Sequence, residues 1–287
     1  MKGSLVAIVT PMNADGTVDY KSFENLIHFH ENAGTDGLVL AGTTGESATL
    51  SSSERNDIFS FVSSATKIPL MAGVGSASTR EALELVEIAQ KNNIFDCLAV
   101  TPFYNRPSQK GLFLHFSELA KPESNIYLYN VPGRTGVDLL PSTVKQLIRT
   151  KNIVGLKEAV ATSERFTELA EILVERPDFI LLSGDDPTFV NFMEKGALGV
   201  ISVAANIIPK VIKNLSDLCL VGSFDQAKRD ISKYLQFFEL LFLEASPSPS
   251  KYLLEKKGLL KNNLRLPLHP LSDEHRETIE LAYEQIK

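Results

Sequence analysis

Short apolar runs rich in β-branched residues recur along the chain, and each precedes a longer segment with helically spaced apolar positions. Successive runs end roughly 28 residues apart, the length of one strand, one helix and their loops. The runs are apolar throughout rather than alternating, which is typical of parallel strands covered by helices on both faces. The eight runs are residues 5–9, 37–40, 69–74, 97–100, 126–129, 153–156, 179–182 and 199–203.

The segments between the runs have the spacing of amphipathic helices. Phe23, Leu26 and Ile27 mark one helical face over residues 20–33, and residues 78–91 show the same pattern. Eight consecutive strand–helix units predict an α/β fold, a closed (β/α)8 TIM barrel. An open doubly wound sheet is the alternative, but it usually has fewer strands and a phosphate fingerprint such as GxGxxG, which this sequence lacks.

The chain continues past the last run for longer than one barrel helix requires. Helical spacing is found over residues 209–221, 224–243 and 250–259 and again from Asp273. We therefore expect a barrel core over residues 1–208, with its last helix continuing to about residue 222. Residues 223–287 should form a C-terminal helical appendage.

The charge balance narrows the classes of function. The chain has 29 Lys and Arg residues and 35 Asp and Glu residues, which gives a net charge of −6, and the two signs are interspersed along the sequence. This excludes a nucleic acid or an anionic membrane surface as the main partner. No run approaches the ~20 apolar residues of a membrane span, and no export signal is visible. Cys97 and Cys219 lack metal-site spacing, so we expect reduced thiols and a cytoplasmic protein.

Lys157 is the most informative single residue. It follows Val154, Gly155 and Leu156 in an otherwise apolar run, at the strand end where barrel active sites lie. Burial favours the neutral amine, which attacks a carbonyl carbon to form a Schiff base. The alternative is a lysine that points outward or pairs with Glu158.

Other strand ends also carry polar side chains. Thr43 and Thr44, between two glycines, offer hydroxyl and N–H groups to a carboxylate or phosphate, or form a plain tight turn. Tyr104 and Tyr129 could transfer protons, or pack with satisfied hydroxyls. Arg134 could bind a substrate carboxylate, or form a surface ion pair.

Two further groups of polar residues are assigned no catalytic chemistry. Asp185 and Asp186 lack a nearby third metal ligand in sequence, so we expect them to cap a loop or the helix that follows Pro187. None of the five histidines lies at a predicted strand end. No metal site is therefore predicted.

These motifs together resemble the dihydrodipicolinate synthase and N-acetylneuraminate lyase family of class I, Schiff-base aldolases. The similarity runs from Val9-Thr10-Pro11 through residues 42–50 and 129–136 to residues 264–268, so it covers essentially the whole chain. It implies an imine between Lys157 and pyruvate, whose carboxylate is held by Thr43 and Thr44. No metal or organic cofactor is implied, because the protonated imine is itself the electron sink.

The resemblance also assigns the proton chemistry and an oligomer. It implies that Tyr129 donates and accepts protons, and that Thr43 and Tyr104 complete a relay in which Tyr104 reaches across a subunit interface. A dimer is then required, and a tetramer built as a dimer of dimers is expected. Gly184 and the carbonyl of Ile201 are expected to line the same pocket.

Arg134 distinguishes the branches of this family. The synthase branch has the pattern YNVPxRTG, which residues 129–136 match, and the sialic-acid lyases lack this arginine. The arginine would bind the carboxylate of L-aspartate 4-semialdehyde. The expected reaction gives 4-hydroxy-tetrahydrodipicolinate, in the first committed step of the diaminopimelate and lysine pathway.

Three alternatives remain open at this point. The chain could be another pyruvate-dependent class I aldolase or hydro-lyase acting on a sugar-derived aldehyde. It could be a non-catalytic barrel that binds a 2-oxo acid, although a reactive amine and a proton relay have no use there. A phosphate-binding barrel is a third alternative, but Asp185 and Asp186 place negative charge where the phosphate would bind.

Feedback inhibition by L-lysine is expected to be weak or absent. Inhibited family members commonly have histidines, an asparagine and a tyrosine at the inhibitor site. This chain retains Glu81, Ser47 and Ala48, but has Ser52, Arg55, Ala77 and Phe103 at the other positions.

Overall fold

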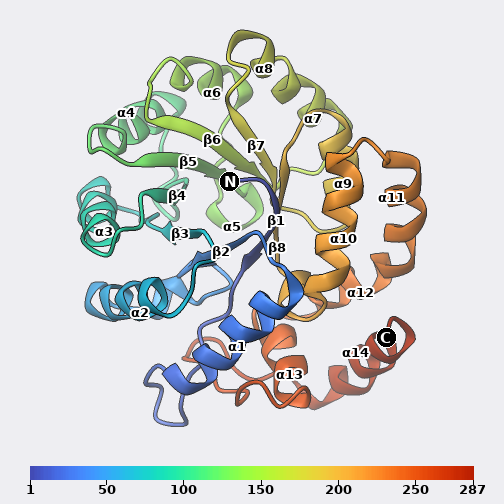
Figure 1. Ribbon diagram of the computed structural model, residues 1–287. Coiled ribbons are helices and arrows are strands. Elements are labelled where there is room, and N and C mark those ends of the chain that lie inside the picture. The colour runs from blue at the N-terminus through green and yellow to red at the C-terminus, as the bar shows by residue number, and fades with distance from the viewer.

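The computed structural model describes residues 1–287 and confirms the predicted barrel (Figure 1). Eight parallel strands follow one another in chain order around the barrel, and the last pairs with the first. The strands are β1 (Gly3–Ala7), β2 (Gly37–Leu40), β3 (Leu70–Gly73), β4 (Asp96–Val100), β5 (Asn125–Asn130), β6 (Ile153–Glu158), β7 (Ile180–Ser183) and β8 (Gly199–Ser202).

Helices surround the strands as a ring (Figure 1). Those of the barrel are α1 (Tyr20–Ala33), α2 (Ser52–Ala65), α3 (Thr79–Lys91), α4 (Gln109–Leu119), α5 (Pro132–Thr135), α6 (Pro141–Leu147), α7 (Ser163–Ala170), α8 (Ile172–Glu175), α9 (Phe189–Glu194) and α10 (Pro209–Leu220), with the short 3₁₀ helices η1 (Ser47–Thr49) and η2 (Ala204–Asn206). After the ring come α11 (Phe224–Ile231), the 3₁₀ helix η3 (Ser232–Tyr234), α12 (Leu235–Leu240), α13 (Ser248–Lys256) and α14 (Asp273–Gln285).

The strands are buried on both faces, as their apolar composition predicts. One cluster of 66 buried residues fills the space between strands and helices. A second cluster of nine lies inside the barrel and includes Leu5, Val39, Leu98, Tyr129 and Ile201. The barrel interior is therefore packed, and room for a ligand is left only at its ends.

The helix predicted over residues 224–243 is broken in the structure. It is divided into α11, η3 and α12, with the break at Ser232. There the Ser232 hydroxyl donates to the carbonyl of Arg229 at 2.7 Å, a side-chain bond that competes with the regular helical pattern. The next helix begins at Ser248, two residues earlier than expected.

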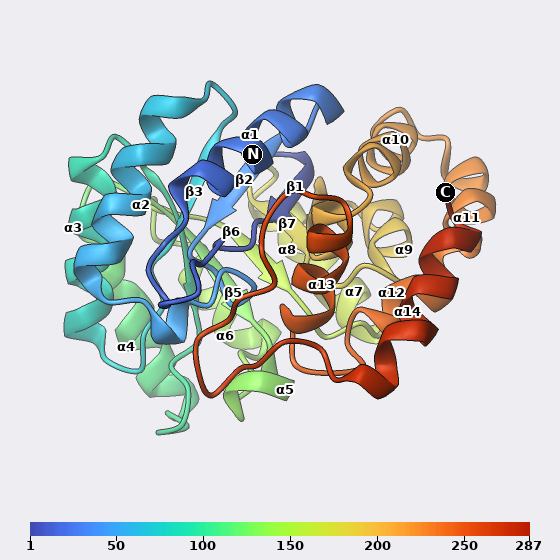
Figure 2. The ribbon, with the colours of Figure 1, turned by 90° about the horizontal axis from the view of Figure 1, so that it is seen from below.

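The C-terminal helices form a second layer on one side of the ring. In Figure 1 they lie outside α9, α10 and α1, and Figure 2 shows α13 and α14 side by side along the barrel flank. α11 packs against α9 and α10, and α13 contacts η2 at the end of β8. This layer therefore approaches the barrel mouth. None of the helices combines the length and apolar character needed to span a bilayer.

Candidate active site

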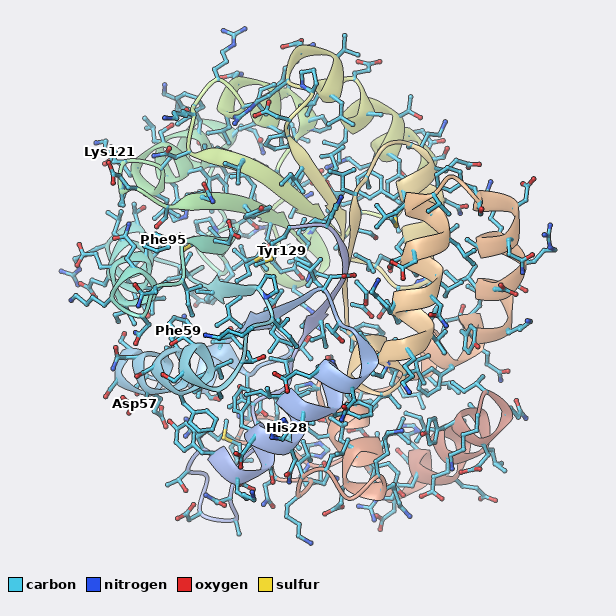
Figure 3. All side chains as sticks on the ribbon, in the orientation of Figure 1. His28, Asp57, Phe59, Phe95, Lys121 and Tyr129 are labelled. Atoms are coloured by element: carbon cyan, nitrogen blue, oxygen red, sulfur yellow. The ribbon has the colours of Figure 1, made fainter.

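A cavity of about 170 Å³ opens at the carboxyl ends of the strands. Figure 3 labels Tyr129 near the centre of the barrel, whereas His28 and Asp57 lie out in the helical ring. The cavity brings together six predicted site residues from five segments: Thr43, Thr44, Tyr129, Arg134, Lys157 and Gly184. It is smaller than the roughly 300–1,000 Å³ of drug-sized ligand pockets, so it suits a small metabolite.

Lys157 lies near the end of β6 and points into this cavity. Its residue is only 6% exposed, and no carboxylate lies within ion-pairing distance of its ammonium. Its nearest aromatic partner is Tyr129, whose ring centroid is 4.1 Å from Nζ. The alternative of a Lys157–Glu158 pair is wrong, because Glu158 pairs with Arg165 instead. A buried lysine without a counter-ion is available for chemistry.

Gly184 makes room for the Lys157 side chain. A Cβ at this position would lie 2.9 Å from Cε of Lys157 and 3.2 Å from the carbonyl oxygen of Glu158. Backbone N–H of Gly184 donates to that same carbonyl at 2.7 Å. Any larger residue here would displace the lysine, which explains a glycine directly after β7.

The loop of residues 42–46 is a rigid turn that also lines the cavity. Glu46 N–H donates to the carbonyl of Thr43 at 3.1 Å, and the Thr10 hydroxyl donates to the carbonyl of Gly45 at 2.7 Å. The hydroxyls of Thr43 and Thr44 have no hydrogen-bond partner within the chain. The loop is thus a tight turn, and two hydroxyls without a partner in the chain line the cavity; ligand binding by them stays a prediction.

Arg134 lies on the short helix α5 at the rim of the cavity. Its side chain is exposed and takes part in none of the ion pairs of the chain. Next to it, Thr135 is buried, and the Thr101 hydroxyl donates to the Thr135 hydroxyl at 3.1 Å. This bond joins the loops that follow β4 and β5. The arginine is thus presented on a fixed turn with its guanidinium free.

Tyr104 does not reach the cavity within one chain. Its residue is 94% exposed, and its backbone has a φ of +70° in the left-handed region. The loop is nevertheless tied down, because Asn105 Nδ2 donates to the carbonyl of Ala77 at 2.9 Å and Arg106 Nε to that of Gly136 at 2.9 Å. The Tyr104 side chain therefore projects into solvent from a strained loop that two hydrogen bonds hold in place, where a neighbouring molecule could contact it.

Ile201 also lies outside the cavity lining. It is buried in β8 with its side chain in the cluster inside the barrel. Val203, two residues further along, lines the cavity in its place. Phe242 lines it as well, although it lies two residues beyond the end of α12 in the C-terminal layer and is 48% exposed. The only sequence signal for Phe242 is the apolar run 240–243.

A buried polar network behind the cavity was not predicted. Asn130 Nδ2 donates to Asp138 at 2.7 Å and to both carboxylate oxygens of Glu158 at 3.0 and 3.1 Å. Arg165 pairs with Asp138 at 2.5 Å and with Glu158 at 3.1 Å. Burial raises the pKa of Glu158 to about 7. Because Asn130 and Glu158 directly follow Tyr129 and Lys157, this network fixes both strand ends.

The two aspartates after β7 act as caps, as predicted. Asp185 accepts from the Thr188 N–H at 3.2 Å and from its hydroxyl at 2.6 Å. Asp186 accepts from the N–H groups of Val203 and Ala204 at 3.0 and 2.9 Å. Burial raises the pKa of Asp186 to about 6. Asp185 additionally lines the cavity, so it places a negative charge beside Gly184.

Comparison with known proteins agrees with this geometry. The chain matches the Dihydrodipicolinate synthetase family over residues 1–286. It is 44% identical over 284 residues to a 4-hydroxy-tetrahydrodipicolinate synthase of Teredinibacter turnerae, covering 98% of this chain and 97% of that one. A synthase of the same name from Shewanella pealeana is 45% identical over 276 residues, 95% of this chain and 93% of the other.

Solved structures of the same kind superpose closely. Dihydrodipicolinate synthase from Aquifex aeolicus matches with a TM-score of 0.96 at 36% identity, over 100% of this chain and 98% of that one. The chloride-inhibited enzyme from Acinetobacter baumannii, complexed with pyruvate, matches with a TM-score of 0.95 at 40% identity, over 99% and 98%. A structure described as the first monomeric dihydrodipicolinate synthase variant matches with a TM-score of 0.96 at 35% identity, over 99% and 96%.

Proposed function

The chain belongs to the dihydrodipicolinate synthetase family and condenses pyruvate with L-aspartate 4-semialdehyde to 4-hydroxy-tetrahydrodipicolinate, and we propose that Lys157 carries this reaction as a pyruvate imine. The observation that carries the proposal is the buried, unpaired ammonium of Lys157 inside the cavity. The reaction is a lyase-type, class I aldol chemistry at the entry to the diaminopimelate and lysine pathway.

The chemical course follows from an amine in a small closed cavity. Nζ of Lys157 attacks C2 of pyruvate, and the carbinolamine loses water to give the imine. Loss of a proton from C3 gives the enamine, whose C3 attacks the aldehyde carbon of the semialdehyde. The α-amino group of the bound product then attacks the imine carbon, displaces Lys157 and closes the ring.

The remaining groups of the cavity divide between the two substrates. The free hydroxyls of Thr43 and Thr44 bind the pyruvate carboxylate, next to Lys157. The guanidinium of Arg134 binds the carboxylate of the semialdehyde at the rim, which a neutral sugar aldehyde lacks. Gly184 and the backbone carbonyl of Ile201 complete the pocket; for Ile201 the support is the resemblance alone.

Proton transfer requires a second subunit in this proposal. Tyr129 transfers protons at the imine, and Thr43 links it to Tyr104 of a neighbouring chain. The support is the exposed ring of Tyr104 on its tethered loop. A homodimer is the minimum assembly, and the proposed state is a homotetramer formed as a dimer of dimers. A monomeric variant among the similar structures makes the assembly a question for experiment.

Neither a metal nor an organic cofactor enters the proposed course. The protonated imine withdraws electrons from C3 and so stabilises the charge left there when the proton is lost. A metal or an organic cofactor is therefore not needed as the electron sink. We place the reaction in the cytoplasm; the support is that Cys97 and Cys219 are both free and buried, as in a reducing compartment.

Substrate preference tests the proposal directly. Pyruvate-dependent turnover is measured with L-aspartate 4-semialdehyde, N-acetylmannosamine and a 3-deoxy-sugar aldehyde, and kcat/KM is compared. A strong preference for the semialdehyde supports the synthase and the role of Arg134. A preference for a sugar aldehyde would keep the imine but move the chain to the alternative, a catabolic aldolase or hydro-lyase of the same family.

A further inference from the structure

Lys251 is a second buried lysine, outside the lining of the cavity that contains Lys157. It lies on α13 in the C-terminal layer, with 0% of its side chain exposed, and forms an ion pair with Glu46, whose side chain is also 0% exposed. Its ammonium further donates to the carbonyl of Asn263 at 2.8 Å. Two charges have thus been removed from water together, which is costly unless every partner is in place.

Glu46 connects this pair to the threonine loop. It is the last residue of the turn that begins at Gly42, and its backbone has a φ of +59° in the left-handed region. Its N–H donates to the carbonyl of Thr43 at 3.1 Å, while its second carboxylate oxygen accepts from the Arg265 N–H at 3.2 Å. The main chain of Glu46 therefore holds Thr43, and its side chain is held by the C-terminal layer.

Arg265 binds the segment that follows the threonine loop. It donates to the carbonyl of Thr49 at 2.7 Å and to that of Gly16 at 2.8 Å, and it pairs with Glu54 on α2 at 3.1 Å. The bond with Arg265 lowers the pKa of Glu54 to about 2. Lys251 therefore holds the chain at Glu46, directly before η1, and Arg265 holds it at Thr49, the last residue of η1; displacement of Glu46 at the end of the threonine loop would break a charged contact.

A pair of buried charges is seldom the most stable filling for such a space. Apolar side chains of the same volume are often as stabilising or more so, because they need no desolvation. What an ion pair with hydrogen bonds adds is a fixed position and orientation. The hydroxyls of Thr43 and Thr44 need a fixed position, because binding of a small carboxylate is sensitive to displacements of about one ångström.

We infer that Lys251 and Glu46 are positioning residues for pyruvate, through which the C-terminal layer sets the carboxylate-binding geometry of Thr43 and Thr44. The inference rests on the proposed function of these threonines. It assigns to the appendage a part in substrate affinity, beyond its packing on the barrel.

The test removes both charges at once, so that no unpaired charge stays buried. The double variant Glu46→Gln with Lys251→Met should raise the KM for pyruvate about tenfold or more. At saturating pyruvate, borohydride reduction of the imine should proceed within about twofold of the wild-type rate, because Lys157 is untouched. A merely structural role would instead lower the yield of folded protein and leave the KM of the folded fraction unchanged.

The matched control lies on the same helix. Lys256 pairs with Glu280 of α14 at 2.8 Å, but the two side chains are 53% and 40% exposed, so Glu280→Gln with Lys256→Met should leave the KM for pyruvate unchanged. If the double variant at Glu46 and Lys251 does not fold, Glu46→Asp carries the test, because it keeps both charges and tolerates the left-handed backbone but shortens the reach to Lys251; a KM increase in the same direction is expected.

The outcomes separate this inference from the proposed function. Failure of wild-type protein to form a reducible adduct with pyruvate would overturn both. A wild-type adduct, together with an unchanged KM in the folded variants, would overturn the role of Lys251 and leave the function standing. An increased KM with an unchanged imine reduction rate supports the inference.

Discussion

The ammonium of Lys157 lies 4.1 Å from the ring centroid of Tyr129, and the two residues are paired in register across β5 and β6. Side chains at paired positions of adjacent parallel strands point to the same face of the sheet. The amine and the phenol therefore enter the cavity together, from strand ends that the Asn130–Glu158 network holds in place.

Tyr129→Phe should separate the two functions of this side chain. The ring that packs against Lys157 is kept, and only the proton-transferring hydroxyl is lost, so turnover should fall about 10²–10⁴-fold. The measurement is the rate of imine formation with pyruvate, followed by borohydride trapping and mass spectrometry. Tyr127→Phe is the matched control, because Tyr127 lies in the same strand but has its hydroxyl 3.3 Å from the N-terminus of the chain. Equal effects at both positions would contradict the assignment.

Arg134→Ala should impair only the second half of the reaction. Trapping of pyruvate at Lys157 should be unchanged, while kcat/KM for the semialdehyde should fall about 10–100-fold, as expected for a lost charged hydrogen bond of about 1.5–3 kcal/mol. Arg80→Ala, at an arginine that is 90% exposed, should leave both steps unchanged. Loss of both half-reactions in Arg134→Ala would show that the guanidinium acts on pyruvate as well.

The sequence predicts the fold and most of the cavity because their signals lie within short stretches of the chain. The apolar character of a buried strand is a property of each short run, and Lys157 is conspicuous because a charged residue directly continues one of those runs. The Asn130–Glu158–Arg165 network depends on the register between two strands, which no local pattern specifies. The positions of Phe242 and Lys251 depend on how the C-terminal layer folds back over the barrel, and the role proposed for Tyr104 depends on a second chain.

Complementation should show whether Tyr104 acts from the neighbouring subunit. Lys157→Ala and Tyr104→Phe are each expected to be nearly inactive alone. In a mixed dimer, one site contains both changes and the other contains neither, so mixed dimers should have about half of the wild-type activity. Activity is measured on protein purified through two different tags. If Tyr104 served its own chain, the mixed dimer would contain no intact site and no activity would return.

L-Lysine should inhibit this enzyme weakly or not at all. Arg55 is buried beside Glu81, and its Nη2 donates to the carbonyl of Ser47 at 2.7 Å. The positively charged side chain of L-lysine would therefore be repelled by the guanidinium that already occupies this position. Turnover is measured with increasing L-lysine, and we expect half-inhibition only above about 1 mM. Arg55→His removes the fixed charge and should increase sensitivity. Half-inhibition of the wild-type protein on the order of 10 µM would contradict this prediction.

Glu158 should make the stability of the protein depend on pH. Burial raises its pKa in the folded protein to about 7, above the ordinary value of 4.5, so the folded state holds a proton that the unfolded state has released. Its contribution therefore decreases as the pH rises from about 4.5 to 7, by about 3 kcal/mol in total, and is constant above and below that range. Glu158→Gln cannot ionise and keeps the side-chain shape. The difference in unfolding free energy between variant and wild type, measured by urea denaturation, should thus shift in favour of the variant by this amount between pH 4.5 and 7. A pH-independent difference would show that Arg165 and Asn130 stabilise the charged carboxylate fully.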